Sequence, residues 1–262
     1  MVPPLLSGSH ISKIFSIQQG FLAKRTPFVA LDDVSVTLFP GETLGIVGES
    51  GSGKSTLGEI LGGLRQATSG TIHFEGAEVS HLEPARLRDY RRNVQFVFQD
   101  PKGSMNPYFT VEKVITEPLV ALGICKDKKQ NRKTAEQILE QVGLQANTIE
   151  KYPGEMSGGQ CQRVAIARAL VVNPKVIVCD EAVSALDVSV QAQILNLLKD
   201  IQAEYHIAYL FISHDIGVVN YMADRIVVLN RGRVVETGNA EDVFRNPREE
   251  YTRRLVESSF SQ

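Results

Sequence analysis

The sequence is short of cysteine, of long apolar runs and of net charge, and each shortage excludes a class of protein. Three cysteines in 262 residues are too few and too scattered for a disulfide framework or a zinc site, which favours a reducing, intracellular compartment. No apolar run approaches the ~18–20 residues of a membrane span. The first ten residues lack the basic flank and apolar core of a secretory signal. With 28 Lys and Arg against 30 Asp and Glu, no overall basic field would attract nucleic acid.

The apolar residues that are present follow two patterns. Near the N-terminus they alternate with polar residues, at 34–38 and 72–74, which is typical of half-buried strands and suggests an antiparallel region. Further along, short continuous apolar runs fit strands buried on both faces of a parallel sheet, at 44–47, 176–179, 207–212 and 226–229. Helical spacing lies between them, as in the stripe formed by Ile194, Leu197, Leu198 and Ile201. The pattern predicts an α/β core.

The middle of the chain is different. Residues 100–165 contain a helical signal at 135–142, a second one at 164–172 starts near their end, and no clear buried strand lies among them, so we expect a helical insertion there. The core would then comprise residues 1–99 and 166–262 of a single domain. We expect an exposed loop at 16–27.

A phosphate-binding loop is predicted at residues 48–55, which match G-x-x-x-x-G-K-[ST] between an apolar run and a helical segment. Glycines let the backbone N–H groups curl around an anion, and the following helix adds its positive end. Lys54 would supply a charge to the outer phosphates, and Ser55 a hydroxyl to Mg²⁺. A glycine-rich linker is the alternative, and the strand and helix context disfavours it. The predicted nucleotide contacts are Gly48, Glu49, Ser50, Gly51, Ser52, Gly53, Lys54, Ser55 and Thr56.

An acidic pair, Asp180 and Glu181, ends the apolar run at 176–179. Strand ends of an open α/β sheet face the ligand crevice. Asp180 is therefore placed to hold Mg²⁺ through water, and Glu181 to orient or deprotonate an attacking water. A plain strand-to-turn acidic pair is common, but the phosphate loop upstream favours the functional interpretation.

Further motifs resemble those of the ATP-binding cassette (ABC) ATPases. Residues 156–160, Met-Ser-Gly-Gly-Gln, resemble the LSGGQ signature with Met in place of Leu. Gln99 resembles the Q-loop glutamine, Asp187 ends a D-loop-like Ser-Ala-Leu-Asp, and His214 resembles the switch histidine. Phe15 takes the place of the aromatic residue that stacks on adenine. Leaving Phe15 aside, six motifs stand in the family's order across most of the chain.

The resemblance implies a P-loop NTPase core of mixed sheet, with an N-terminal antiparallel β region and an inserted helical subdomain. It also implies two nucleotide-binding subunits facing head to tail, with ATP between the phosphate loop of one and the signature of the other. Lys54, Mg²⁺ and the opposing Ser157 would stabilise phosphate charge, because phosphoryl transfer depends mainly on positioning and charge.

The remaining roles also follow from the resemblance. Glu181 would act on water, His214 would contact the γ-phosphate, and Gln99 would couple the site to the helical insertion. Other nucleotide contacts implied are Ser157, Gly158, Gly159, Gln160, Asp180, Asp187, Gln99 and Phe15. The implied Mg²⁺ ligands are Ser55, Gln99 and Asp180.

Several of these residues have a simpler interpretation when taken alone. His214 could be a histidine at the edge of the core, and Phe15 a core aromatic residue. Gln99 by itself is uninformative. Cys161 and Cys179 are interpreted as small packing residues. The family usually has Pro after the acidic pair where this chain has Ala182, and since alanine can adopt the same φ we expect only a modest loss of stiffness.

Within the family, the sequence resembles the peptide/nickel import branch. The features are residues 98–107, similar to FQDPxxSLNP, and residues 251–255, similar to PYTRxL. Many members carry a C-terminal extension with cysteines, and this sequence ends at Gln262 without it, so we expect a short member. The branch implies a heterodimer with a second ATPase, two membrane permease subunits and an extracytoplasmic binding protein. The location implied is the cytoplasmic face of the membrane.

The leading hypothesis is an ATPase subunit that powers import of peptides or of nickel and metal complexes, or an antimicrobial-peptide-type uptake subunit of the same branch. A soluble ABC ATPase acting on nucleic acid or ribosomes is disfavoured by the near-neutral charge. A catalytically weak regulatory subunit is disfavoured by the presence of Lys54, Glu181 and His214. The cargo is left open.

Overall fold

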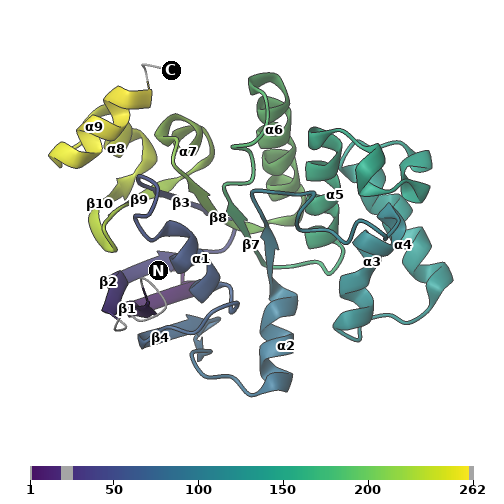
Figure 1. Ribbon diagram of the computed structural model, residues 1–262, viewed down its shortest axis with the longest axis horizontal. Coiled ribbons are helices and arrows are strands. Elements are labelled where there is room, and N and C mark those ends of the chain that lie inside the picture. The colour runs from purple at the N-terminus through teal and green to yellow at the C-terminus, as the bar shows by residue number, and fades with distance from the viewer. Residues whose placement is uncertain (1, 19–25, 260–262) are drawn as a thin grey trace. The chain divides into compact units, whose positions relative to one another are not determined.

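The computed structural model describes residues 2–18 and 26–259, and the chain forms two compact units. The first comprises Met1–Leu87 and Ala208–Gln262, and the second comprises Arg88–Ile207. Figure 1 labels the helices and strands of both units.

An antiparallel sheet occupies the N-terminal part of the first unit. Its strand order is β2-β1-β4-β5, with bounds β1 (Leu6–Ile17), β2 (Thr26–Leu38), β4 (Ser69–Phe74) and β5 (Ala77–Glu78). The predicted alternation at 34–38 is confirmed, because Val34, Val36 and Leu38 are buried while Ser35 is exposed.

The same unit contains a mixed group of strands in the order β10-β9-β3-β8. The bounds are β3 (Thr43–Val47), β8 (Ala208–Ser213), β9 (Arg225–Asn230) and β10 (Arg233–Asn239). β3 pairs in parallel with β8 and β9, and every residue of β3 and β8 is buried, as predicted for strands covered on both faces. β10 pairs antiparallel with β9.

Helices cover these strands. They are α1 (Lys54–Leu61), α7 (Ile216–Met222), α8 (Ala240–Arg245) and α9 (Glu250–Ser259). α7 packs directly on β3, because a Cβ on Gly45 would lie 2.2 Å from Val219 Cγ1. α7, α8 and α9 gather beside β9 and β10 at the C-terminal end of the chain (Figure 1).

The second unit combines two parallel strands with helices. The strands are β6 (Val94–Val97) and β7 (Val176–Asp180). The helices are α2 (Pro84–Asn93, of which residues 88–93 belong to this unit), α3 (Val111–Ala121), α4 (Lys128–Gln141), α5 (Gly158–Leu170) and α6 (Val188–Tyr205), with 3₁₀ turns η1 (Ala146–Glu150) and η2 (Pro153–Glu155). α3, α4 and α5 pack side by side (Figure 1). The apolar stripe predicted on α6 is buried.

Some expectations need correction. The helix expected at 135–142 begins at Lys128, because the Asp127 side chain accepts hydrogen bonds from the N–H groups of Lys129 and Gln130 and caps it. The predicted loop at 16–27 is shorter than expected, since Ser16 pairs with Pro27 as part of β1 and β2. The rest of that loop, residues 19–25, lies outside the described residues.

No helix in the described part of the chain combines the length and the apolar character that crossing a membrane needs.

Glu236 of β10 fixes the start of α9. Its carboxylate oxygens accept hydrogen bonds from the N–H groups of Arg248 at 2.9 Å and Glu249 at 3.2 Å. Burial opposes ionisation of Glu236, but the hydrogen bonds outweigh it and hold its pKa below the usual range. The carboxylate thereby ties the C-terminal helix to the strand that precedes it.

Replacing Glu236 by glutamine should destabilise the chain by about 1–2 kcal/mol, because bonds to a charged acceptor are stronger than bonds to an amide. A folded pKa below the unfolded value contributes stability that is complete above about pH 4.5 and is lost as pH falls through the folded pKa. The variant should therefore show a flatter fall of Tm between about pH 5 and 3. Thermal unfolding followed across that range is the measurement. Glu78→Gln, at an exposed residue, is the control. If Glu236→Gln and the wild-type chain had the same dependence of Tm on pH, the stabilising role of the Glu236 carboxylate would be contradicted.

Candidate functional site

The predicted phosphate loop joins β3 to α1, and its glycines are required by close approach. A Cβ on Gly48 would lie 2.1 Å from the carbonyl oxygen of Leu229. Gly53 has φ +108°, and a Cβ there would lie 2.6 Å from the carbonyl oxygen of Ala30. Gly51, at φ +79°, has open space around it. The loop is therefore a tightly packed turn whose backbone only glycine can form at 48 and 53.

Lys54 lies inside this turn. Its side-chain ammonium donates hydrogen bonds to the carbonyl oxygens of Gly48 at 2.7 Å and Glu49 at 2.9 Å, and the residue is only 4% exposed. Ser55, the next residue of α1, is exposed, and Thr56 is half-buried. The buried hydroxyl of Ser52 has no hydrogen-bond partner among the described residues. The loop thus holds a cation and an unsatisfied polar group at the N-terminus of a helix, which suits an anion.

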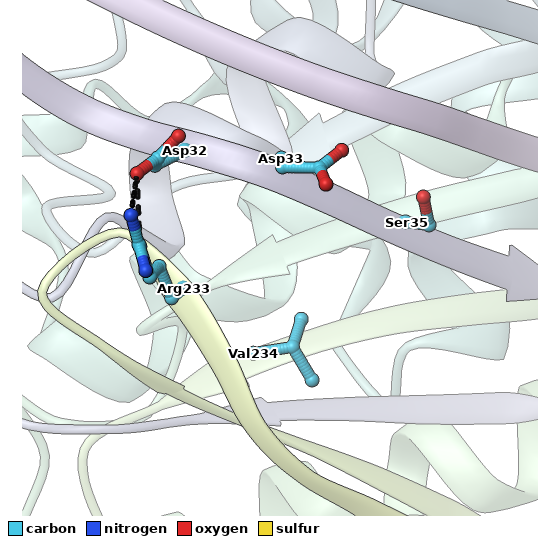
Figure 2. Close-up of a pocket in the computed structure, with 5 residues that line it drawn as sticks. All are labelled: Asp32, Asp33, Ser35, Arg233 and Val234. Atoms are coloured by element: carbon cyan, nitrogen blue, oxygen red, sulfur yellow. Dashed lines mark hydrogen bonds and ion pairs between the residues drawn. The ribbon is translucent and has the colours of Figure 1, made fainter.

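The phosphate loop is hydrogen-bonded to the turn between β9 and β10, which is in turn hydrogen-bonded to β2. The N–H of Gly232 donates to the carbonyl oxygen of Ser52 at 2.9 Å, and the carbonyl of Gly232 accepts from the N–H of Asp32 at 2.8 Å. The Asp32 carboxylate in turn accepts from Arg233 Nε at 2.8 Å, a pair that Figure 2 shows at the edge of a pocket between β2 and β10. Sequence analysis did not find this support, because residues about 200 positions apart meet in it.

A second unforeseen contact reaches the loop from α9. The N–H of Glu49 donates to the hydroxyl oxygen of Tyr251 at 3.0 Å. Burial raises the pKa of Tyr251, so its hydroxyl is protonated at neutral pH. The resemblance of residues 251–255 to a branch motif drew attention to this tyrosine but gave no signal of the contact.

His214 lies at the same sheet edge as the loop. β3 and β8 pair in parallel with Val47 opposite Ser213, so Gly48 and His214 follow adjacent strand ends. His214 is exposed, which does not support its interpretation as a packed histidine at the edge of the core. The next residue, Asp215, caps α7 by accepting from the N–H of Gly217 at 2.8 Å.

Phe15 lies near the end of β1 and is half-buried. Its ring is flanked by two cations, with Lys13 Nζ at 5.3 Å and the Arg65 guanidinium carbon at 5.1 Å from the ring centre. The ring is therefore packed against cationic side chains and is not a fully buried core residue.

In the second unit, the strand ends bring Gln99 near the acidic pair. β6 and β7 are parallel with Val97 opposite Cys179, so Asp180 ends β7 while Gln99 and Glu181 follow the carboxyl ends of the two strands. Gln99 is exposed, and Asp180 and Glu181 are half-buried.

The backbone at Glu181 is strained. It has φ +49°, in the left-handed region that non-glycine residues rarely adopt. Its carbonyl oxygen accepts hydrogen bonds from Ser184 Oγ at 3.0 Å and Ser184 N–H at 3.2 Å, which hold the turn in this shape. Ala182 is buried beside it.

The residues of the predicted signature form the start of α5. Ser157 Oγ accepts from the N–H of Gln160 at 3.3 Å, and the Gln160 side chain accepts from the N–H of Ser157 at 3.1 Å, which is a capping box. Ser157 and Gly158 are exposed, and a Cβ on Gly159 would lie 2.6 Å from Val190 Cγ1 of α6. An exposed helix N-terminus with a hydroxyl at its tip suits an anion.

Asp187 has a structural task in this geometry. Its carboxylate caps α6 by accepting from the N–H of Val190 at 3.0 Å, and it also accepts from Ser189 Oγ at 2.8 Å. The bond from Val190, followed by that from Ser189, lowers the pKa of Asp187.

The segment after Gln99 is tied to α5 by an arginine that sequence analysis missed. Arg168 donates to the carbonyl oxygen of Ser104 at 2.7 Å, and burial lowers the pKa of this guanidinium. α5 therefore begins at the signature and ends by holding the segment that follows Gln99.

The cysteines near these motifs are packing residues. Cys161 and Cys179 are both fully buried, and burial raises the pKa of Cys179 to about 12. A thiol of this kind stays protonated and unreactive.

The described residues contain no group of three or more His, Cys, Asp or Glu side chains that could hold a metal ion by themselves. Mg²⁺ commonly takes one or two protein ligands, with water and phosphate oxygens completing its shell. The exposed hydroxyl of Ser55 and the carboxylate of Asp180 are ligands of the oxygen type that Mg²⁺ prefers.

Comparison with known proteins agrees with the motifs. A family model described as ABC transporter matches residues 31–184. The glutathione import ATP-binding protein GsiA of Pectobacterium atrosepticum is 47% identical over 254 residues, which is 97% of this chain and 41% of GsiA. The oligopeptide transport ATP-binding protein OppF of Lactococcus lactis subsp. lactis is 46% identical over 253 residues, covering 96% of this chain and 79% of OppF. The chain thus spans about two fifths of the length of GsiA.

Solved structures show the same fold. The ATP-binding cassette MJ0796, in a dimeric post-hydrolysis state bound to ADP and Pi, matches with a TM-score of 0.80 at 30% identity, over 90% of this chain and 98% of that one. CbiO1 of Clostridium perfringens, part of the ABC transporter complex cbiONQ, matches with a TM-score of 0.77 at 27% identity, over 98% and 96%. From the motifs, the fold and these relatives together, the chain belongs to the ABC transporter family.

Proposed function

We propose that the chain is the subunit that binds and hydrolyses ATP to power a membrane importer of peptides or of nickel and other metal complexes. The observation that carries the proposal is Lys54, held inside a glycine turn that is closed to any larger residue at two positions. The 46–47% identity to two import ATP-binding proteins over nearly the whole chain supports the importer assignment.

The residues of the first unit would bind the triphosphate. The N–H groups of residues 48–56 and the ammonium of Lys54 neutralise phosphate charge, and the cation-flanked ring of Phe15 stacks on adenine. His214, at the strand end beside the loop, donates to the terminal phosphate.

The residues of the second unit would act on water and metal. Glu181 accepts a proton from water, and its strained turn fixes the direction of its side chain. The Mg²⁺ ligands that the family resemblance implies are Ser55, Gln99 and Asp180, whose side chains all offer oxygen. The metal, when bound, neutralises charge on the phosphate oxygens.

A second ATPase subunit would complete the site by presenting its own signature. The exposed Ser157 and Gly158 and the half-buried Gly159 at the start of α5, together with Gln160 and Asp187, support this arrangement, because an exposed helix N-terminus capped by a hydroxyl can receive a partner's phosphate. MJ0796 is a dimer in its ADP-bound state, and the branch favours a heterodimer. A tight, ATP-independent homodimer in gel filtration would contradict the heterodimer.

Replacing Ser157 by arginine tests the arrangement in trans. The bulky cation should prevent closure of two subunits and lower ATP turnover by about tenfold or more, while ATP affinity of the same chain changes less than about twofold. Turnover and equilibrium nucleotide binding are measured on the same preparation. Exposed Gln137→Arg on α4 adds the same charge elsewhere and should have no effect. Loss of ATP binding in isolated Ser157→Arg chain would show that the signature serves its own loop.

The partners we propose are two permease subunits and an extracytoplasmic binding protein, with this chain attached at the cytoplasmic face of the membrane. Co-purification with the permeases is the direct experiment, followed by ATP turnover with the binding protein and a set of peptides or nickel complexes. Turnover that rises with the loaded binding protein supports the importer. Turnover that rises instead with DNA or ribosomes would overturn it in favour of a nucleic-acid ATPase.

A further inference from the structure

We propose that Tyr251 of α9 is a positioning residue for the phosphate loop, holding the peptide unit whose carbonyl retains the ammonium of Lys54. This inference rests on the proposed function. It concerns one peptide unit, the C=O of Gly48 and the N–H of Glu49, which are parts of the same rigid plane.

The two hydrogen bonds of this peptide unit are coupled by its planar geometry. A trans peptide unit is planar, and its C=O and N–H point in opposite directions. On one side the N–H of Glu49 donates to the hydroxyl of Tyr251 at 3.0 Å. On the other side the carbonyl oxygen of Gly48 accepts from Lys54 Nζ at 2.7 Å. Fixing the N–H therefore fixes the direction of the carbonyl that holds the lysine.

Tyr251 is itself held in place by the contacts of α9. Glu236 holds the N–H groups of Arg248 and Glu249 immediately before α9, and Thr252, one residue beyond the tyrosine, is fully buried. α9 packs on α7 and β10. A phenol ring on a helix held in this way keeps its hydroxyl in one place, which is the requirement for a supporting residue.

The orientation of this peptide unit decides whether the loop is shaped to bind phosphate. Glycine at 48 gives this peptide unit little intrinsic preference for one orientation. Without the tyrosine hydroxyl the unit keeps the hydrogen bond from Lys54 but loses the one at its N–H, so the loop spends more of its time in shapes that do not bind phosphate. A loss of pre-organisation of this kind weakens binding without touching the reacting atoms.

The test is Tyr251→Phe, which keeps the ring and removes only the hydroxyl. We expect the Kd for ATP with Mg²⁺ to rise about three- to tenfold, the scale of one lost hydrogen bond, while kcat at saturating ATP changes less than about twofold. In the nucleotide-free chain, amide hydrogen exchange at Glu49 should accelerate by a similar factor. Tyr108→Phe, at a side chain that is 87% exposed, is the matched control and should change none of these values.

The outcomes separate the two claims. Wild-type chain that fails to bind ATP would contradict the proposed function, and this inference with it. If the wild-type chain binds ATP and Tyr251→Phe binds it equally tightly, with unchanged amide exchange at Glu49, the inference is overturned and the proposed function stands. A fall in kcat with an unchanged Kd would also overturn it, because the tyrosine would then act on the chemical step.

Discussion

Replacing Glu181 by glutamine should leave ATP bound and lower its hydrolysis by about a hundredfold or more, the usual cost of a lost general base. Glutamine has nearly the same shape, so the turn held by Ser184 and the left-handed backbone at 181 should persist. The effect would then arise from the lost ability to accept a proton. Single-turnover hydrolysis and equilibrium ATP binding, measured side by side, separate the two steps.

A matched control for this variant is Glu140→Gln, an exposed carboxylate on α4 that should hydrolyse ATP at the wild-type rate. Turnover retained within a few-fold in Glu181→Gln would remove Glu181 from the role of base. Loss of ATP binding in the same variant would instead make the carboxylate part of the binding site.

Replacing Gly53 by alanine should weaken ATP binding by about a hundredfold or more. Two costs add at this position. The backbone has φ +108°, which alanine adopts poorly, and the new Cβ would lie 2.6 Å from the carbonyl oxygen of Ala30, a backbone atom that cannot move aside easily. The chain must therefore change shape where it leads into Lys54.

Gly51→Ala is the control that separates these costs. Gly51 also has a left-handed backbone, φ +79°, but a Cβ there meets nothing within 4 Å. It should lose about 1–2 kcal/mol of binding from strain alone, roughly five- to thirtyfold in affinity. Nucleotide titration and thermal unfolding of both variants are the measurements. Equal losses at 51 and 53 would show that packing against Ala30 does not matter.

Much of the fold and the membership of its family could be predicted from local pattern. The alternation at 34–38 indicates a strand with one buried face, because side chains on a strand change face at every residue. The continuous apolar run at 44–47 indicates a strand buried on both faces. β6 escaped prediction because four residues with a glutamine among them give too short a pattern. The start of α4 escaped because its first turn is charged and only the cap at Asp127 marks it.

The motifs of the candidate site could be predicted from the sequence, but the long-range hydrogen bonds that hold the phosphate loop could not. The loop at 48–55 is contiguous, so its chemistry can be read from one segment. The contacts of Glu49 with Tyr251 and of Ser52 with Gly232 join positions about 200 residues apart, and nothing in one sequence links them. The left-handed backbone at Glu181 could not be predicted from the sequence either, because a positive φ is expected at glycine and not at glutamate. The roles assigned to the site residues remain predictions.

The cap at the start of α5 has a consequence for how an incoming phosphate could be received. A hydroxyl accepts and donates at once, so Ser157 can keep its bond from the Gln160 N–H and still offer its own proton outward. The helix tip then needs no rearrangement when charge arrives. Aspartate caps helices equally well, but it would bring a negative charge to the same point. Of serine and aspartate, only serine caps the helix without adding a negative charge that would repel the phosphate.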